Sequence, residues 1–330
     1  MLRRRTLLAV PALAAPAVLT RSAHAQQARN WPDRPLRVIV GFPPGGSLDV
    51  LTRLMADQLS ARVGQPVVVE NRPGAAGNIG ADAVAKAAPD GTTIGTIPFI
   101  APLVAPHLYR SLPFNPERDF AWVSEVWEFP NVAVVPTQHV PARTIAEFIA
   151  WAKTRPQGVS YGSPGVGTSP HLSAALFLQR AGVRGEHVPF RGAAQTIPAM
   201  LSGDVHFALD NLASYVPVIQ EGRMRALAVT SAERWPTMPD VPTLQEAGGP
   251  AGFTAVSWSI WAFPNGTPAP IVERLASEIA AINSSPALIE RARTMGAKLL
   301  ASTPDAVRAR IERERALWRE MVEVSGARME

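Results

Sequence analysis

The chain alternates short apolar runs with stretches whose apolar residues recur at helical spacing. The run Leu36 to Val40 predicts a buried strand, and after a turn rich in proline and glycine the apolar positions from Ser47 onward predict an amphipathic helix. A second unit of the same kind follows about 120 residues later, with a short strand at 159–161, a glycine-containing turn and a helix from about Ser169. The sequence therefore predicts the same strand, turn and helix twice.

The same alternation continues through the rest of the chain. Short apolar runs such as "PVVVENR", "TTIGTIP", "NVAVVP" and "VHFALD" lie between helical stretches, which predicts an α/β fold with mostly parallel sheets. Two long charged helices are expected at about 269–283 and 304–325, with apolar stripes toward the core and charges toward water. We assign them to packing and surface rather than to chemistry.

The first 25 residues have the three parts of an export signal. "MLRRRTLLAVPALAAPAVLTRSAHA" begins with a basic segment, continues with an apolar segment and ends in an A-x-A cleavage site, so we expect cleavage near Ala25 and a periplasmic mature protein. The sequence leaves open whether export uses the Sec or the twin-arginine route. Removing this segment takes away four arginines and no acid, so the formal net charge falls from +5 to +1.

This charge and the residue counts exclude several classes of protein. A mature net charge near neutrality does not favour a nucleic-acid partner. The chain has no cysteine, so its fold rests on a core without disulfides. The histidines show no metal-binding spacing, and neither a dinucleotide fingerprint nor a phosphate-binding loop occurs. We therefore expect no metal and no cofactor.

The two turns carry the candidate chemistry. Backbone N–H groups at a helix start are suited to an anion, and glycines at 45 and 46 allow a ligand to approach the backbone. The alternative reading is structural, because Ser47 could be an ordinary helix cap and Asp49 an ordinary first-turn acid. In the second turn, Ser163 and Thr168 add hydroxyl groups that could donate to a carboxylate.

Many separate motifs resemble one family. The runs "LRVIVGFPPGGSLDVLTRLMADQL", "VVVENRPGAAGNIGADAVAKAAPDGTTIG", "SYGSPGVGTSPHLSA", "HVPFRGAAQTIPAMLSGDVHFALDNL" and "WAFPNGTPAPIVERL" are similar to the Bug (TctC-type) periplasmic solute receptors of tripartite tricarboxylate transporters. The resemblance implies a two-lobed periplasmic-binding-protein fold (type II-like) with the ligand cleft between the lobes and the chain crossing twice. The implied lobes are residues 27–128 with 253–330, and residues 129–252.

The resemblance also implies that the cleft binds a small carboxylate. The candidate ligand-binding residues are Phe42, Pro43, Gly45, Gly46, Asp49, Ser163, Gly165, Gly167, Thr168, Phe190 and Asp210. Family members often have a tyrosine at the position of Phe190, so this chain offers an apolar wall there. Two other residues keep two readings: His171 as packing or ligand contact, and Arg191 as carboxylate partner or surface ion pair. Asn211 falls where the family places a turn at the cleft.

Three functions fit these residues. The first is a receptor that delivers a di- or tricarboxylate, an acidic amino acid or an aromatic acid to the membrane subunits of a tripartite tricarboxylate transporter. The second is a ligand sensor for a membrane regulator. The third, an exported hydrolase, has little support, because Gly162 to Gly165 is one residue short of a nucleophile elbow. We expect a monomer that is not an enzyme.

Overall fold

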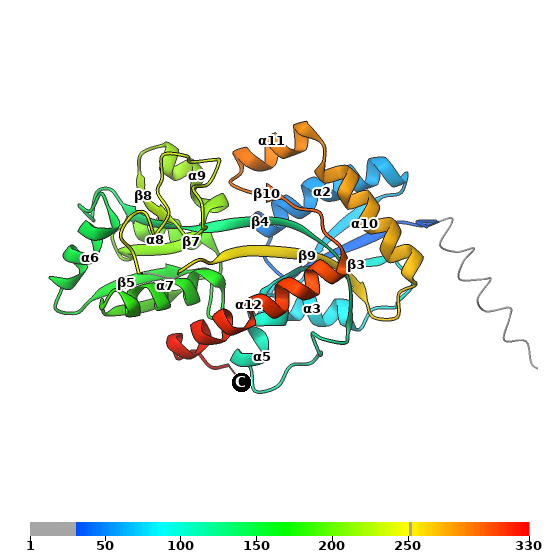
Figure 1. Cartoon of the computed structure of the whole chain (residues 1–330), viewed down its shortest axis with the longest axis horizontal. Coiled ribbons are helices and arrows are strands. Elements are labelled where there is room, and N and C mark those ends of the chain that lie inside the picture. The colour runs from blue at the N-terminus through cyan, green and yellow to red at the C-terminus, as the bar shows by residue number, and fades with distance from the viewer. Residues whose placement is uncertain (1–30, 251–252, 330) are drawn as a thin grey trace, which may run out of the picture.

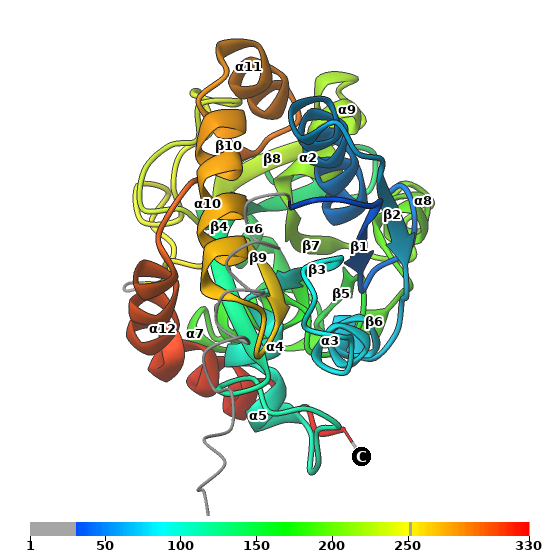
Figure 2. The same cartoon turned by 90° about the vertical axis from the view of Figure 1, so that its right-hand side faces the viewer.

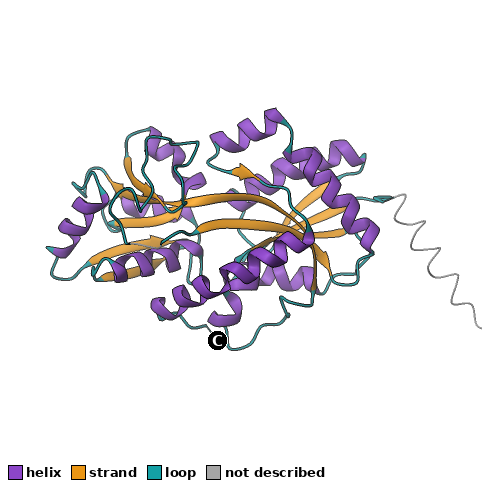
Figure 3. Cartoon of the chain, in the orientation of Figure 1, coloured by secondary structure: helices purple, strands orange, loops and turns teal. Residues whose placement is uncertain are grey.

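The computed structural model describes residues 31–250 and 253–329, and the predicted signal peptide lies outside them. The molecule is elongated, with a central sheet that runs through two α/β lobes and helices packed around it (Figures 1 and 3). This is the two-lobed α/β fold that the sequence predicted.

The first lobe is built on three parallel strands. β1 (Leu36–Val40) lies between β2 (Val67–Asn71) and β3 (Thr93–Pro98), and both pairings are parallel. Alternate residues of β1 point to opposite faces of the sheet. Leu36 and Val38 join one apolar core, whereas Ile39 joins another.

Helices cover both faces of this lobe. The core of Leu36 and Val38 also contains residues of α2 (Ser47–Val63) and α10 (Ala269–Asn283), and that of Ile39 contains residues of α3 (Asn78–Ala85) and α12 (Pro304–Ser325). In Figure 2, α2 and α3 lie on opposite sides of β1 and β3. The shorter helical segments of this lobe are η1 (Ala75–Gly77), α4 (Ile100–Leu103) and α5 (Ala105–Leu108).

Two long strands join the lobes. The first part of β4 (Phe120–Pro136) pairs antiparallel with β9 (Val256–Pro264). The same part of β4 also pairs with the short strand β10 (Lys298–Leu299). From Asn131 onward, β4 pairs with strands of the second lobe instead. Hydrogen-bonded pairing is therefore continuous from one lobe to the other.

The second lobe repeats the layered arrangement. β5 (Val159–Ser163) lies between β6 (Gly185–Pro189) and β7 (Phe207–Asn211) in parallel, while β7 and β8 (Met224–Val229) flank β4 in antiparallel register. Its helices are α6 (Ile145–Lys153), α7 (Ser169–Arg180), α8 (Ala193–Leu201) and α9 (Leu212–Gln220). The sheets are thus mixed rather than mostly parallel, because the crossing strands pair antiparallel with their neighbours.

The C-terminal helices occupy the residues that the sequence predicted for α10 and α12, and α11 (Pro286–Thr294) lies between them in the chain. α12 also anchors the crossing strands. The partly buried guanidinium of Arg310 contacts Glu125 and Glu128 of β4 at 2.7 and 3.0 Å, and lies 4.5 Å above the ring of Trp258 in β9. In the part of the chain that the structure describes, no helix is long and apolar enough to cross a membrane.

Candidate ligand-binding cleft

The turn between β1 and α2 is held by a buried carboxylate. Asp49, 2% exposed, accepts the backbone N–H of Gly45 at 2.9 Å and the side-chain amide of Asn71 at 2.8 Å, and pairs with Arg53 at 3.0 Å. Burial opposes its charge, but the hydrogen bonds from Arg53, Gly45 and Asn71 outweigh this and lower the pKa of Asp49. Gly45 has φ +80, which a residue with a side chain adopts only at a cost.

The turn between β5 and α7 is held by its own hydroxyl groups. Ser163 is fully buried, and its Oγ lies 3.1 Å from the carbonyl oxygen of Gly165, to which it donates, and 2.7 Å from Nε2 of His187. Thr168 also donates to the Gly165 carbonyl, at 2.7 Å. These hydroxyl groups are therefore engaged in shaping the turn.

A stacked pair of histidines packs next to this second turn. The rings of His171 and His187 stack with centroids 3.9 Å apart, and Nδ1 of His171 accepts the backbone N–H of Gly167 at 3.2 Å. Burial, followed by the proximity of His187, lowers the pKa of His171 to about 3. Burial lowers that of His187 to about 4. His171 is thus a packed residue that positions the turn, in line with the structural alternative.

Both turns face one cavity of about 640 Å³ between the lobes. Four helices contribute the residues at their N-terminal ends to its wall: α2 with 46–48, α7 with 168–170, α8 with 192–194 and α9 with 211, 213 and 214. The first amides of a helix have no carbonyl partner within that helix, and the helix dipole makes this end electropositive. The cavity is therefore suited to a negatively charged group.

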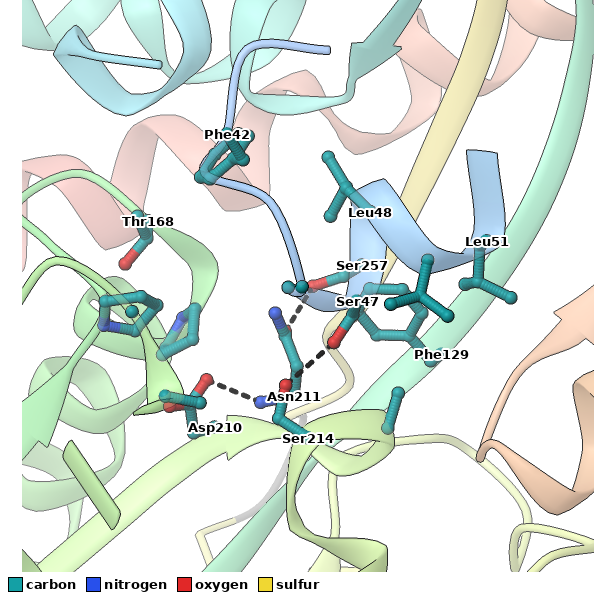
Figure 4. Close-up of a pocket in the computed structure, with 18 of the residues that line it drawn as sticks. Phe42, Ser47, Leu48, Leu51, Phe129, Thr168, Asp210, Asn211, Ser214 and Ser257 are labelled. Atoms are coloured by element: carbon teal, nitrogen blue, oxygen red, sulfur yellow. Dashed lines mark hydrogen bonds between the residues drawn. The ribbon is translucent and has the colours of Figure 1, made fainter. Parts of the chain in front are cut away.

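Side chains from both lobes meet in this cavity (Figure 4). The hydroxyl oxygens of Ser47 and Ser214 are 2.8 Å apart, which joins α2 to α9 across the cleft. Ser257 of β9 donates to Ser169 of α7 at 2.9 Å, and its Oγ also lies 3.3 Å from Oδ1 of Asn211. The two lobes are thus in direct contact through hydroxyl and amide groups.

Asp210 is the acidic side chain among the described residues of the wall. It is 1% exposed, accepts the backbone N–H of Asn211 at 2.7 Å and accepts the hydroxyl of Tyr215 at 3.1 Å. Burial raises the pKa of Asp210 to about 7, although both hydrogen bonds act in the opposite direction. The side chain therefore changes charge near neutral pH.

The predicted site residues divide into two groups. Those that line the cavity are Phe42, Pro43, Gly45, Gly46, Thr168 and Asp210. Those that lie outside its wall are Asp49, Ser163, Gly165, Gly167 and Phe190. Asp49 and Ser163 are occupied within their turns, and Phe190 packs with the apolar core of the second lobe. Arg191 and Asn211 also line the cavity.

Other polar wall residues were not among those predicted from the sequence. Ser214 and Ser257 lie far from the two turns in the chain, and no local pattern marks them. The start of α8 at 192–194 does have a local signal, because Gly192 precedes a helical stretch much as Gly46 does. A search for every glycine at a helix start could have found it.

Comparison with known proteins finds a family model that matches most of the chain. The sequence profile of the family described as "Tripartite tricarboxylate transporter family receptor" (TctC) matches residues 51–326. The Bordetella pertussis protein BugT is 36% identical over 303 residues, which cover 92% of each chain.

Solved structures of similar proteins have the same fold. A protein from R. palustris, solved with adipate, superposes with a TM-score of 0.86 at 35% identity, over 91% of this chain and 100% of that one. MatC from Rhodopseudomonas palustris, solved with bound malate, superposes with a TM-score of 0.81 at 29% identity, over 88% and 100%.

Proposed function

This chain belongs to the TctC (Bug) family of periplasmic solute-binding receptors, and we propose that it captures a small carboxylate between its lobes and delivers it to a tripartite tricarboxylate-type transporter. The observation that carries the proposal is the convergence of four helix N-termini on one cavity. Such a site binds an anion through fixed backbone dipoles and does not need a cluster of cationic side chains. The adipate and malate in two related structures support a carboxylate as that anion.

The ligand is held and released unchanged. Ser163 and His187 are in hydrogen-bond contact, as a nucleophile and its base would be, but Ser163 is fully buried and lies outside the cavity wall. This burial favours a receptor over a hydrolase. We assign residues 27–128 with 253–330 to one lobe and 129–252 to the other, so that ligand binding closes the lobes about β4 and β9.

Binding is tested by calorimetry on the mature protein, purified from the periplasm after cleavage near Ala25. A panel of carboxylates is titrated, and ligand that copurifies is identified by mass spectrometry. We expect saturable binding of at least one carboxylate, recovery of that ligand intact after overnight incubation, and a smaller radius of gyration in its presence. A ligand that is converted during incubation would instead indicate a hydrolase, and the absence of any carboxylate binding would contradict the proposal.

Transport and sensing are separated in cells. Deletion of the gene should abolish uptake of the labelled ligand, and a copy that encodes Gly46→Val should fail to restore it. If uptake is unchanged while a transcriptional response to the ligand is lost, the protein is a sensor for a membrane regulator.

A further inference from the structure

The polar side chains of the cavity wall are unevenly distributed. The half between the two turns contains Thr168, Asp210 and Asn211, together with apolar residues of the turns such as Phe42 and Pro43. The other half, which we call the apolar chamber, is lined mainly by Leu48, Val50, Leu51, Phe129, Ala213, Val216 and Met295, beside the polar Gln220 and Thr294. In Figure 4, Ser47 and Ser214 lie between Thr168 and Asp210 on one side and Leu51 and Phe129 on the other.

The apolar chamber is formed by elements of both lobes. Leu51 and Phe129, each 1% exposed, belong to the apolar core of the first lobe, where Leu48 and Met295 pack against them. α9 lies on the opposite side of the chamber. Its Ala213 is close to the chain that follows Met295, because a Cβ atom added to Gly296 would lie only 3.1 Å from the backbone of Ala213. Leu51 and Phe129 thus form the packed floor of the chamber, and the more exposed Leu48, Val50 and Met295 are the side chains that a ligand can reach.

Charge distinguishes the halves as well. The charged side chains in the described part of the wall are Arg191 and Asp210, and neither belongs to the apolar chamber. A tricarboxylate brings several negative charges, and each needs compensation when it leaves water. The helix N-termini can compensate a carboxylate in the polar half, whereas no charged side chain of the described wall lies in the apolar chamber to compensate a second one there.

We infer that the ligand is a carboxylate joined to an apolar body, a hydrocarbon chain or ring, rather than a compact hydroxylated di- or tricarboxylate. This inference rests on the proposed function and specifies its substrate class. The carboxylate lies at the helix N-termini of the polar half, and the apolar body extends past Ser47 and Ser214 into the apolar chamber. Burial of that body then supplies much of the affinity.

The first test is calorimetry with acetate, butanoate, hexanoate, benzoate, malate and citrate. From acetate to hexanoate, each methylene should tighten binding about fourfold until the chamber is full. Hexanoate or benzoate should bind more tightly than malate and citrate. If malate or citrate binds more tightly, this inference is wrong while the proposed function stands; if no carboxylate binds, both are wrong.

Two variants locate the apolar body. Leu48→Asn places an amide in the chamber wall and should lower the ratio of hexanoate affinity to acetate affinity about tenfold. Ala213→Met fills the chamber from the opposite side and should lower the same ratio, which keeps the test decisive if one variant fails to fold. Val68→Asn, at a 55% exposed position of β2, is the matched control and should leave the ratio unchanged. An unchanged ratio in a folded chamber variant would place the apolar body elsewhere and overturn the inference.

Discussion

The hydroxyl oxygens of Ser47 and Ser214 lie 2.8 Å apart, although 167 positions separate these residues in the chain. Ser47 is the first residue of α2 in one lobe and Ser214 belongs to α9 in the other. This hydrogen bond exists only when the lobes are together, so it stabilises the closed form of the cleft. It also stands between the polar half of the cavity and the apolar chamber.

Loss of this bond should shift the protein toward the open form. Ser214→Ala removes one neutral hydrogen bond worth about 1 kcal/mol, so we expect about fivefold weaker ligand binding, mostly through faster dissociation. Calorimetry and stopped-flow fluorescence measure both effects. Ser284→Ala is the matched control, because Ser284 is exposed and donates to the carbonyl of Ala281 at the C-terminal end of α10. Equal dissociation rates in both variants would show that the bond does not hold the lobes together.

Two glycine variants should separate binding from folding. A Cβ atom at Gly46 would approach nothing closer than the Pro43 carbonyl oxygen, at 3.6 Å, so Gly46→Val should fold normally while its side chain occupies the ligand's place. At Gly167, φ is +79 and the added Cβ would lie 2.2 Å from Leu108, so Gly167→Val should lose stability. Thermal unfolding and calorimetry test both variants. A folded Gly46→Val protein with full affinity would move the ligand away from this turn.

The charge of Asp210 should make ligand affinity depend on pH. Burial raises its pKa to about 7, so the side chain is largely neutral at pH 6 and charged at pH 8, where it repels the ligand carboxylate. We expect affinity to fall between these pH values in the wild-type protein and to stay constant in Asp210→Asn. Calorimetry across this range gives the result, and parallel curves for the two proteins would contradict the assignment.

Asp210 should affect folding stability in the same direction. Its pKa is raised above the unfolded value, so the folded protein binds more protons between about pH 4 and 7 and this group's contribution to stability falls as pH rises through that range. Relative to wild type, Asp210→Asn should therefore gain thermal stability from pH 5 to pH 8. A constant difference between the two unfolding temperatures would show that Asp210 keeps an ordinary pKa.

The stacked histidines should weaken the protein in acid. Both have pKa values below that of an unfolded histidine, so between pH 6.5 and about 4 the unfolded chain binds protons that the folded chain does not, and stability falls as pH falls. His187→Gln keeps a partner for Ser163 without the titration and should unfold at lower pH than wild type. An acid midpoint of His187→Gln equal to that of wild type would contradict this account.

The parts predicted correctly from the sequence depend on local patterns. The helices at 269–283 and 304–325 were expected from apolar stripes and were found at those residues, because spacing along one helix decides which face is buried. The turn at 42–46 was expected at a ligand site because proline and glycine mark it and because the family resemblance implies ligand contacts there. The structure places Phe42, Pro43, Gly45 and Gly46 on the cavity wall, and their contact with a ligand stays a prediction.

The remaining features depend on contacts between distant segments. Asp49 and Ser163 have the chemistry of ligand donors or acceptors, but their partners, Gly45 and Asn71 for one and Gly165 and His187 for the other, become visible only in the fold. Ser214 and Ser257 reach the cavity because α9 and β9 are placed there by the second crossing of the chain. Residue type alone does not distinguish a side chain that holds a turn from one that faces a ligand.

The course of β4 limits how the lobes can move. Its first part pairs with β9 and its last residues pair with β7 and β8, so the connection between the lobes is a hydrogen-bonded ribbon and not a flexible loop. A ribbon of this kind twists and bends under load but resists shear, since sliding would break its pairing. We therefore expect opening to twist and bend this ribbon, and the register shifts between Glu125 and Trp127 and between Ala133 and Val134 mark places where its regular pairing is interrupted. The pairing of these strands therefore sets the relative orientation of the two lobes in the protein without ligand.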